Sequence, residues 1–395
     1  MFENIVLRRS ENGLPVSAGQ IAEALLYYQN VNLVIDHGTL GTLVKQLGIN
    51  RFISLLKHPD LKAVHCEESL ATHSQNFGNF NVHTYVTLKF SGHETVGNLK
   101  TRAERLQYLF TREGLSRREA GRYAEQFESR VPARKFSGDH FQKGGIVAAA
   151  KQDLLDAEFT REALRLAVTS MVGGYPIGTD LKFDVIDSDI GFHVFTNIDI
   201  EGINRRRAAC APPHDPISVP LLMSHILEAR ADLALASFYG GDFSTSDMTS
   251  TILRVRHAEL LRRTHLNVDA RDDFSEVVLP DCPSLREVID SGERSFDDFL
   301  LLLDKAKRFK EWLKSVNPDK NLIRTYLRDV TAEDWIQSIP AKTLRYLFTT
   351  GLDATNPLLG IAATLVDTFV VEKLVRGWRP NHFIDARLTP FVNKP

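Results

Sequence analysis

The side chains best suited to chemistry are histidines and carboxylates near the start of the sequence. Six of the 13 histidines fall within 57 residues, and carboxylates stand beside two of them. Imidazole and carboxylate groups together bind zinc or manganese, and one such group can instead activate water as a general base. The pattern predicts Asp36, His37, Glu67 and Glu68 as catalytic residues, and His37, His65 and Glu67 as metal ligands.

Two predicted strands would place these residues at one edge of a sheet. The apolar runs at 31–36 and 61–66 are typical of buried strands. If the strands are parallel, their carboxyl ends meet where open α/β sheets bind ligands, and Arg8 and Arg9 project from the same edge. One hypothesis is therefore a metal-dependent hydrolase or nuclease acting on a phosphate-containing substrate, with a divalent metal as its cofactor. The general character of the sequence, and no particular motif, suggests microbial defence against phage as the setting for this activity.

A purely structural role for the same residues stays open. The histidines have no fixed i,i+4 spacing, and surface or hydrogen-bonded interior positions are the more frequent roles of such residues. No dinucleotide fingerprint, nucleophile elbow, zinc-protease motif or kinase signature is present. Residues 92–98 have the glycine spacing of a phosphate-binding loop, but Asn98 stands where that loop needs a lysine. Any cofactor is therefore unknown.

A predicted pair of helices over residues 98–130 carries local positive charge. Residues 97–138 contain ten basic and five acidic residues. A helix, a short glycine turn and a second helix that begins with a capping box match the layout of a helix-turn-helix. Arg117, Arg118 and Arg122 would then contact nucleic acid, although the interleaved glutamates favour a solvated face. The net charge of −2 gives this nucleic-acid hypothesis no global support.

Opposite charges are segregated further along the chain. Residues 269–304 hold 11 acidic and three basic residues, whereas 205–207 is a run of arginines. Such patches invite pairing between domains or subunits, although a solvated acidic surface is the default role of such charges. Trp378 and Phe383 add aromatic interface anchors, which could instead close the core. The leading hypothesis is an intracellular interaction or sensor protein that assembles through helical, charge-segregated surfaces, with a protein partner or as a homo-oligomer.

The order of the predicted elements indicates a mixed α and β fold. An N-terminal α/β portion holds a small, mainly parallel sheet, a central α+β part carries a β-hairpin near 181–196, and the C-terminal half is mostly α-helical. Within that half, 295–315 is predicted as one helix and 274–279 as a strand-like piece. The corresponding predicted domains cover residues 1–95, 96–265 and 266–395.

Cysteine usage and hydropathy give expectations about the compartment. The three cysteines have no paired spacing, so we expect neither disulfides nor a thiolate zinc site, as in the reducing cytoplasm. We also expect no signal peptide at the N-terminus. Residues 357–376 are mostly apolar, but charged residues interrupt them, so we expect a buried helix there and no membrane span.

Overall fold

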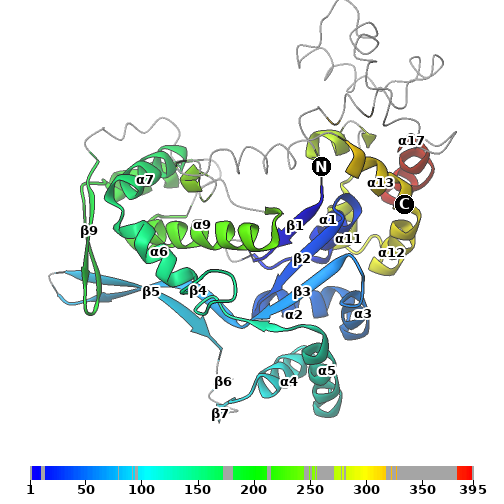
Figure 1. The fold of residues 1–395 in the computed structure, drawn as a ribbon, viewed down its shortest axis with the longest axis horizontal. Helices are drawn as coiled ribbons and strands as arrows, with labels where there is room; N and C mark the ends of the chain where they lie inside the picture. Colours follow the sequence, from blue (N-terminus) through cyan, green and yellow to red (C-terminus); the bar gives the residue numbers. More distant parts are fainter. Residues whose placement is uncertain are drawn as a thin grey trace, which may run out of the picture. The chain divides into compact units, whose positions relative to one another are not determined.

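The computed structural model describes most of the chain up to residue 316 and a short C-terminal segment (Figure 1). Backbone contacts divide the chain into two compact units, and neither is one continuous stretch of sequence. Unit 1 comprises Met1–Asn4, Ser17–Val31 and Thr264–Pro395, and unit 2 comprises Ile5–Val16 and Asn32–Arg263. The three-domain division therefore stays a prediction. The described residues are 2–9, 14–78, 80–90, 92–93, 97–171, 181–210, 215–243, 249, 251–253, 255, 271–276, 278–279, 282–316, 322, 326 and 380–393.

Sheet A is a five-stranded parallel sheet, which confirms the predicted α/β character of the N-terminal part. Its first strands are apolar runs whose side chains are almost all buried, as expected where a parallel sheet is covered on both faces. The strand order is β11-β1-β2-β3-β8. The strands are β1 (Asn4–Leu7), β2 (Asn30–Ile35), β3 (Leu61–Cys66), β8 (Ala133–Arg134) and β11 (Asp242–Phe243).

Four helices of unit 2 lie next to sheet A in the chain and pack on one another in pairs. Helix α2 packs on α4, and α3 packs on α5. The predicted capping box of α5 is present, because the Ser116 hydroxyl accepts from the Glu119 amide and the Glu119 carboxylate accepts from the Ser116 amide. Gly114 supplies the positive φ that the turn before α5 needs. The four helices are α2 (His37–Leu47), α3 (Ile49–Leu55), α4 (Arg102–Arg112) and α5 (Arg117–Arg130).

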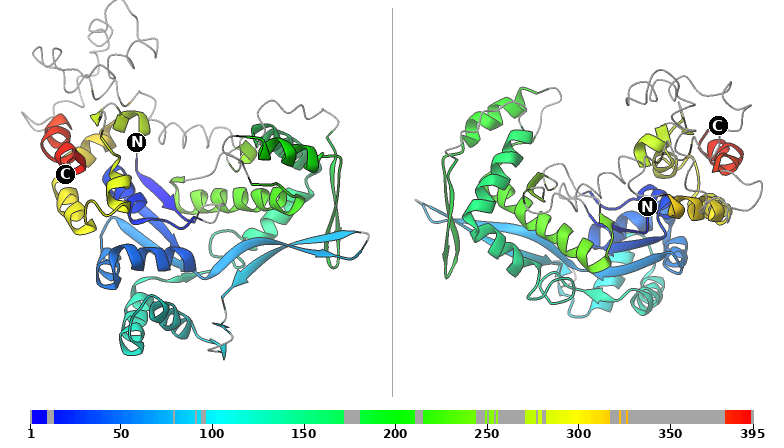
Figure 2. Two further views of the ribbon diagram at one scale, coloured as in Figure 1. Left: turned by 180° about the vertical axis from the view of Figure 1, so that it is seen from behind. Right: turned by 45° about the horizontal axis from the view of Figure 1, so that its top comes forward.

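Sheet B consists of two β-hairpins that cross each other, as both views in Figure 2 show. The strand order is β4-β5-β10-β9, and β10 pairs with β5 at Phe192 and His83. Gly191 permits this close crossing, because an added Cβ would lie 2.5 Å from the His83 carbonyl oxygen. The strands are β4 (Glu68–Asn76), β5 (Asn81–Lys89), β9 (Phe183–Ser188) and β10 (Gly191–Thr196), and a separate small pair is β6 (Gly92–His93) with β7 (Gly97–Asn98).

Helices cover one face of sheet B. Tyr85 and Phe192 share that face and are buried in a core cluster that also takes side chains from sheet A. The Tyr85 hydroxyl donates to the Met223 carbonyl on α9, which fixes the helix against the sheet. The helices of this part are α6 (Ile146–Leu155), α7 (Ala157–Met171), α8 (Ile200–Ala208) and α9 (Val219–Tyr239).

Unit 1 is built from α1 and the C-terminal helices. Asp290 accepts from the Ser17 hydroxyl and the Gly19 amide, which ties the start of α1 to the end of α11. Phe309 lies in an aromatic core with Tyr27 and Trp312. The elements are α1 (Ala18–Tyr27), α11 (Leu285–Asp290), α12 (Phe296–Lys305), α13 (Lys307–Ser315), α17 (Pro380–Phe383), the π-helix η3 (Ile384–Leu388) and α18 (Thr389–Asn393).

The structure confirms the mixed α and β fold and the hairpin near 181–196, but it corrects two predicted elements and adds a strand that was not predicted. The helix predicted over 295–315 is broken at Ala306, whose amide bonds to the Leu303 carbonyl, so that α12 and α13 each bury their own apolar face. The predicted strand-like piece is helical over 271–276, with Phe274 fully buried. Strand β4 was not predicted, because its sequence is mostly polar.

Within the described ranges, no helix has both the length and the apolar character that crossing a bilayer requires. The helix predicted over 357–376 lies outside the described residues.

Candidate functional site

The carboxyl edge of sheet A gathers most of the residues that the sequence singled out. Asp36 directly follows β2, Glu67 directly follows β3, and Arg8 and Arg9 directly follow β1. Because the sheet is parallel, these positions share one edge, as predicted. What each side chain contacts at this edge decides what chemistry it can do.

The arginines after β1 are engaged by carboxylates. Arg8 forms ion pairs with Glu228 and Asp232 of α9, both at 2.6 Å, and its side chain is only 12% exposed. Arg9 lies 3.4 Å from the Asp36 carboxylate. Asp36 in turn accepts from the Thr39 amide at 2.7 Å and so caps the start of α2. Asp36 therefore has a structural role at this edge, and a catalytic role stays a prediction.

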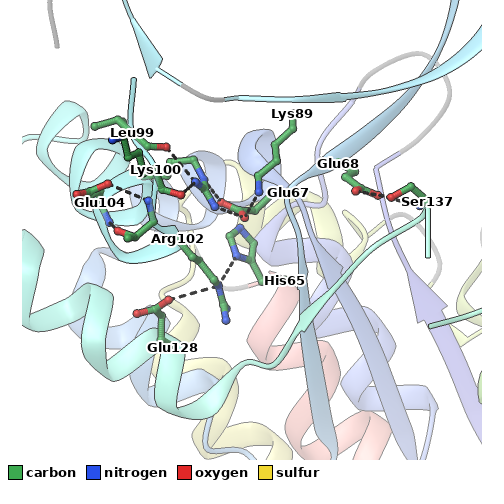
Figure 3. A network of polar contacts seen from close by, with 12 residues as sticks. His65, Glu67, Glu68, Lys89, Leu99, Lys100, Arg102, Glu104, Glu128 and Ser137 are labelled. Atoms are coloured by element: carbon green, nitrogen blue, oxygen red, sulfur yellow. Dashed lines mark hydrogen bonds and ion pairs between the residues drawn. The ribbon is translucent and has the colours of Figure 1, made fainter. Parts of the chain in front are cut away.

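The Glu67 carboxylate is bound by a side chain from the first turn of α4 (Figure 3). Arg105 donates from Nε and from its terminal nitrogen to the two carboxylate oxygens, at 2.6 and 2.7 Å. The Lys89 ammonium lies 3.4 Å away. Burial is the largest single effect on the pKa of Glu67 and acts to raise it, but the Arg105 hydrogen bonds and the neighbouring charges, such as those of Arg105 and Lys89, together outweigh it, and the pKa is lowered. The side chain is thus a paired carboxylate at neutral pH, with both oxygens occupied by one guanidinium.

His65 is almost completely buried at the same edge. Arg102 donates from Nε to His65 Nδ1 at 3.1 Å, and Phe127 packs edge-on against the imidazole ring. Arg102 also donates to the Val131 carbonyl at 2.6 Å. Burial first, and then the positive charge of Arg102, lower the pKa of His65 to about 3. The ring is therefore neutral at physiological pH, and we assign its proton to Nε2 because Nδ1 accepts.

Cys66 is the last residue of β3, and Glu68 is the first residue of β4. Glu68 accepts from the Ser137 amide at 2.8 Å and from its hydroxyl at 2.6 Å, and so fixes the segment after β8. Cys66 is fully buried, and this burial raises the pKa of its thiol to about 12. A thiol that stays protonated at neutral pH is a poor nucleophile.

His37 has a different environment from the other candidate residues. It begins α2, packs against Phe90 and lines a partly open cavity of about 200 Å³ between α2 and α4. The Arg112 and Glu113 side chains line the same cavity. Burial and then the Arg112 charge lower the pKa of His37 below its ordinary value. A neutral imidazole beside a cavity can accept a proton, but the other predicted catalytic residues do not line this cavity.

The proposed metal ligands do not form a coordination site. His65 Nδ1 is occupied by Arg102, and both Glu67 oxygens are occupied by Arg105, whereas His37 faces the cavity beside α4. In the part of the chain that the structure describes, no three His, Cys, Asp or Glu side chains are grouped as a metal ion requires. The structure thus gives the divalent-metal hypothesis no ligand set.

The predicted nucleic-acid residues lie on the first turns of α5. Arg117, Arg118 and Arg122 are exposed, and the Arg122 guanidinium lies over the Tyr123 ring at 4.7 Å. The buried faces of α4 and α5 meet around Phe110 and Phe127. The exposed arginines fit the solvated face as well as nucleic-acid contact, so the latter stays a prediction.

One of the two predicted interface anchors, Phe383, is buried in unit 1. Phe383 is 4% exposed and stacks on Phe309 at a centroid distance of 5.1 Å, a position that fits closure of the core of unit 1. Trp378 lies outside the described residues. An interface role for either residue stays a prediction.

Sequence reasoning missed a group of exposed apolar side chains on sheet B. Among the described residues, 11 large hydrophobic side chains are exposed, and six of these belong to its two hairpins. A signal was present, because the 20 residues from Ser69 to Leu88 contain no Asp, Glu, Lys or Arg in a chain that is 25% charged. We call the six residues the hairpin surface: Phe77, Phe80, Leu88, Ile186, Ile190 and Phe195.

Four residues of the hairpin surface, Phe77, Phe80, Ile186 and Phe195, are connected through His193 and its strand. Phe77 stacks on Phe80 with centroids 5.7 Å apart, and Phe80 contacts His193 at 5.3 Å. His193 pairs with Ile186 across β9 and β10, and Phe195 follows two positions later on the same face.

Comparisons with family models, curated proteins and solved structures find no match to this chain.

Proposed function

We propose that this chain is an interaction protein that assembles through the hairpin surface of sheet B. The observation that carries the proposal is the concentration there of six exposed apolar side chains, each between 48% and 59% exposed. Contiguous apolar side chains on the surface of a folded protein mark interaction sites more often than isolated ones do. The polar edge of sheet A, in contrast, is occupied by ion pairs and caps that hold its own elements together.

The aromatic pair at the tip of the first hairpin is suited to act as an anchor. Phe77 and Phe80 are stacked in advance, and the Phe77 amide donates to the Phe80 carbonyl at 2.9 Å. Aromatic side chains that are already ordered lose little entropy on binding, and such residues dominate interface energies. The absence of charged residues from Ser69 to Leu88 also matches interface cores, which are depleted in charge.

The charge-segregated helices predicted from the sequence supply further surfaces for this proposal. Arg205 and Arg206 are exposed on α8, and Asp297 and Asp298 are exposed on α12. Contacts between such charges would respond to ionic strength, whereas contacts of the hairpin surface would not. Salt dependence therefore separates the two kinds of contact, and we assign the leading role to the hairpin surface.

The test is sedimentation of the full chain over a hundredfold range of concentration. We expect the wild type to associate reversibly. The Phe77→Ser, Phe80→Ser double variant should associate at least about tenfold more weakly, because it removes both anchors. Leu155→Ser on α6 is the matched control, since Leu155 is 43% exposed in the same unit but lies outside the hairpins. Association that survives in the double variant, or a wild type that stays monomeric, would contradict the proposal.

We also propose a cytoplasmic location. The three cysteines, Cys66, Cys210 and Cys282, all lie within the described residues and form no disulfide there, as expected where thiols stay reduced. Fractionation of cells that express the tagged full chain tests this location, and recovery of the chain outside the cytoplasm would contradict it.

A further inference from the structure

The two outer strands of sheet B differ in how well their edges are protected. An edge strand presents unpaired backbone N–H and C=O groups, and natural proteins block them with charges, prolines, bulges or short strand length. The six-residue edge strand β9 follows this rule, because it carries Asp184 and Asp187, and Asp189 stands in the turn beside it. The edge at β9 is therefore protected against pairing with another strand.

The edge at β4 has none of these protections beyond its first residue. The strand has nine residues, and Ser69–Asn76 contains no charged residue and no proline. Its register with β5 runs without interruption from Glu68 opposite Lys89 to Asn76 opposite Asn81, so no bulge disturbs the edge. Among the described strands, β4 pairs with β5 alone. A long, regular and uncharged edge is a template for another strand.

The outer half of β4 is accessible. Every residue from 73 to 76 is exposed, whereas residues 69–72 are half-buried. The half-buried part is held by α9, because the Thr72 hydroxyl lies 2.8 Å from the Ser224 hydroxyl. The helix therefore supports β4 near its start and leaves the exposed half open to a partner strand.

We propose that the partner at this edge is a second copy of the chain, whose β4 pairs antiparallel with β4 across a twofold axis near Ser74. The inference rests on the proposed assembly function and names its partner. At a twofold axis the strand pairs with its own sequence, so an edge that carries charges of one sign repels itself. The ribbon Ser69–Leu88 carries no Asp, Glu, Lys or Arg, and it can meet its copy without that repulsion. The aspartates of β9 would face aspartates in the equivalent arrangement.

A charge-swap experiment tests this pairing directly. An axis near Ser74 sets His73 opposite Gln75 of the second copy, so we combine His73→Lys with Gln75→Lys in one variant and His73→Glu with Gln75→Glu in another. Like charges then face each other, and we expect each variant alone to dimerise about tenfold more weakly than the wild type. An equimolar mixture should recover a heterodimer. Asp184→Lys on β9 is the control and should leave dimerisation unchanged.

Hydrogen exchange of the unmodified protein gives a second measurement that does not depend on the folding of any variant. We expect the amides of 73–76 to become protected as the concentration rises, while those of β9 do not change. Charge variants that dimerise like the wild type, or β4 amides that exchange at one rate throughout, would overturn the β4 pairing. If the Phe77 and Phe80 variant still loses association in that case, the hairpin-surface proposal stands and only the β4 partner is wrong.

Discussion

Acid should destabilise this protein through His65 before its carboxylates titrate. The buried imidazole accepts from Arg102, and its pKa is lowered to about 3 from an ordinary value of 6.5. A base whose pKa is depressed in the folded state stabilises the fold above its unfolded pKa, and this stability is lost as the pH falls. The loss therefore begins near pH 6.5 and continues towards pH 3.

The size of the effect follows from the two pKa values. Between pH 7.0 and pH 5.5 the unfolded imidazole becomes almost fully protonated, whereas the folded one stays neutral. The linkage relation then gives a loss of about 1 kcal/mol in the free energy of unfolding. Water screens this interaction little, because His65 is only 2% exposed.

The measurement is reversible urea unfolding, followed by far-UV circular dichroism, at these two pH values. His65→Gln is the test variant, since glutamine keeps a hydrogen-bond acceptor for Arg102 but does not titrate. Its loss between pH 7.0 and 5.5 should be smaller than that of the wild type by about 1 kcal/mol. His37 and His83 also have lowered pKa values, but both proteins contain them and their contributions cancel. Equal losses in the two proteins would refute the reasoning.

Two further substitutions test contacts of unit 2. Arg105→Ala should cost about 3 kcal/mol of unfolding free energy, because it strips the Glu67 carboxylate of both guanidinium hydrogen bonds. Urea unfolding checks this, and replacing both partners by methionine should recover most of the loss. Gly191→Ala should destabilise by about 2 kcal/mol more than Gly78→Ala, because only the former places a Cβ against the His83 carbonyl. Equal melting temperatures for the two glycine variants would show that the β5–β10 crossing tolerates a side chain.

Much of the backbone of sheet A was predictable because its signals are local. The run 61–66 is strand β3 as predicted, and the predicted capping box is present at the start of α5. Strand β4 lacked such a signal, since strand alternation appears only where one face is buried, and residues 73–76 of β4 are exposed. The break at Ala306 also has no sequence signal, because no glycine or proline stands there.

The sequence by itself determined strands β2 and β3, the capping box of α5 and the edge at which Asp36, His65 and Glu67 gather, because chain order and hydropathy specify these features. Only the tertiary structure decided what those residues do, because their partners come from distant positions: Arg105 occupies Glu67, and Arg102 occupies His65. It also decided which apolar side chains stay exposed, since burial depends on what packs against each face of sheet B.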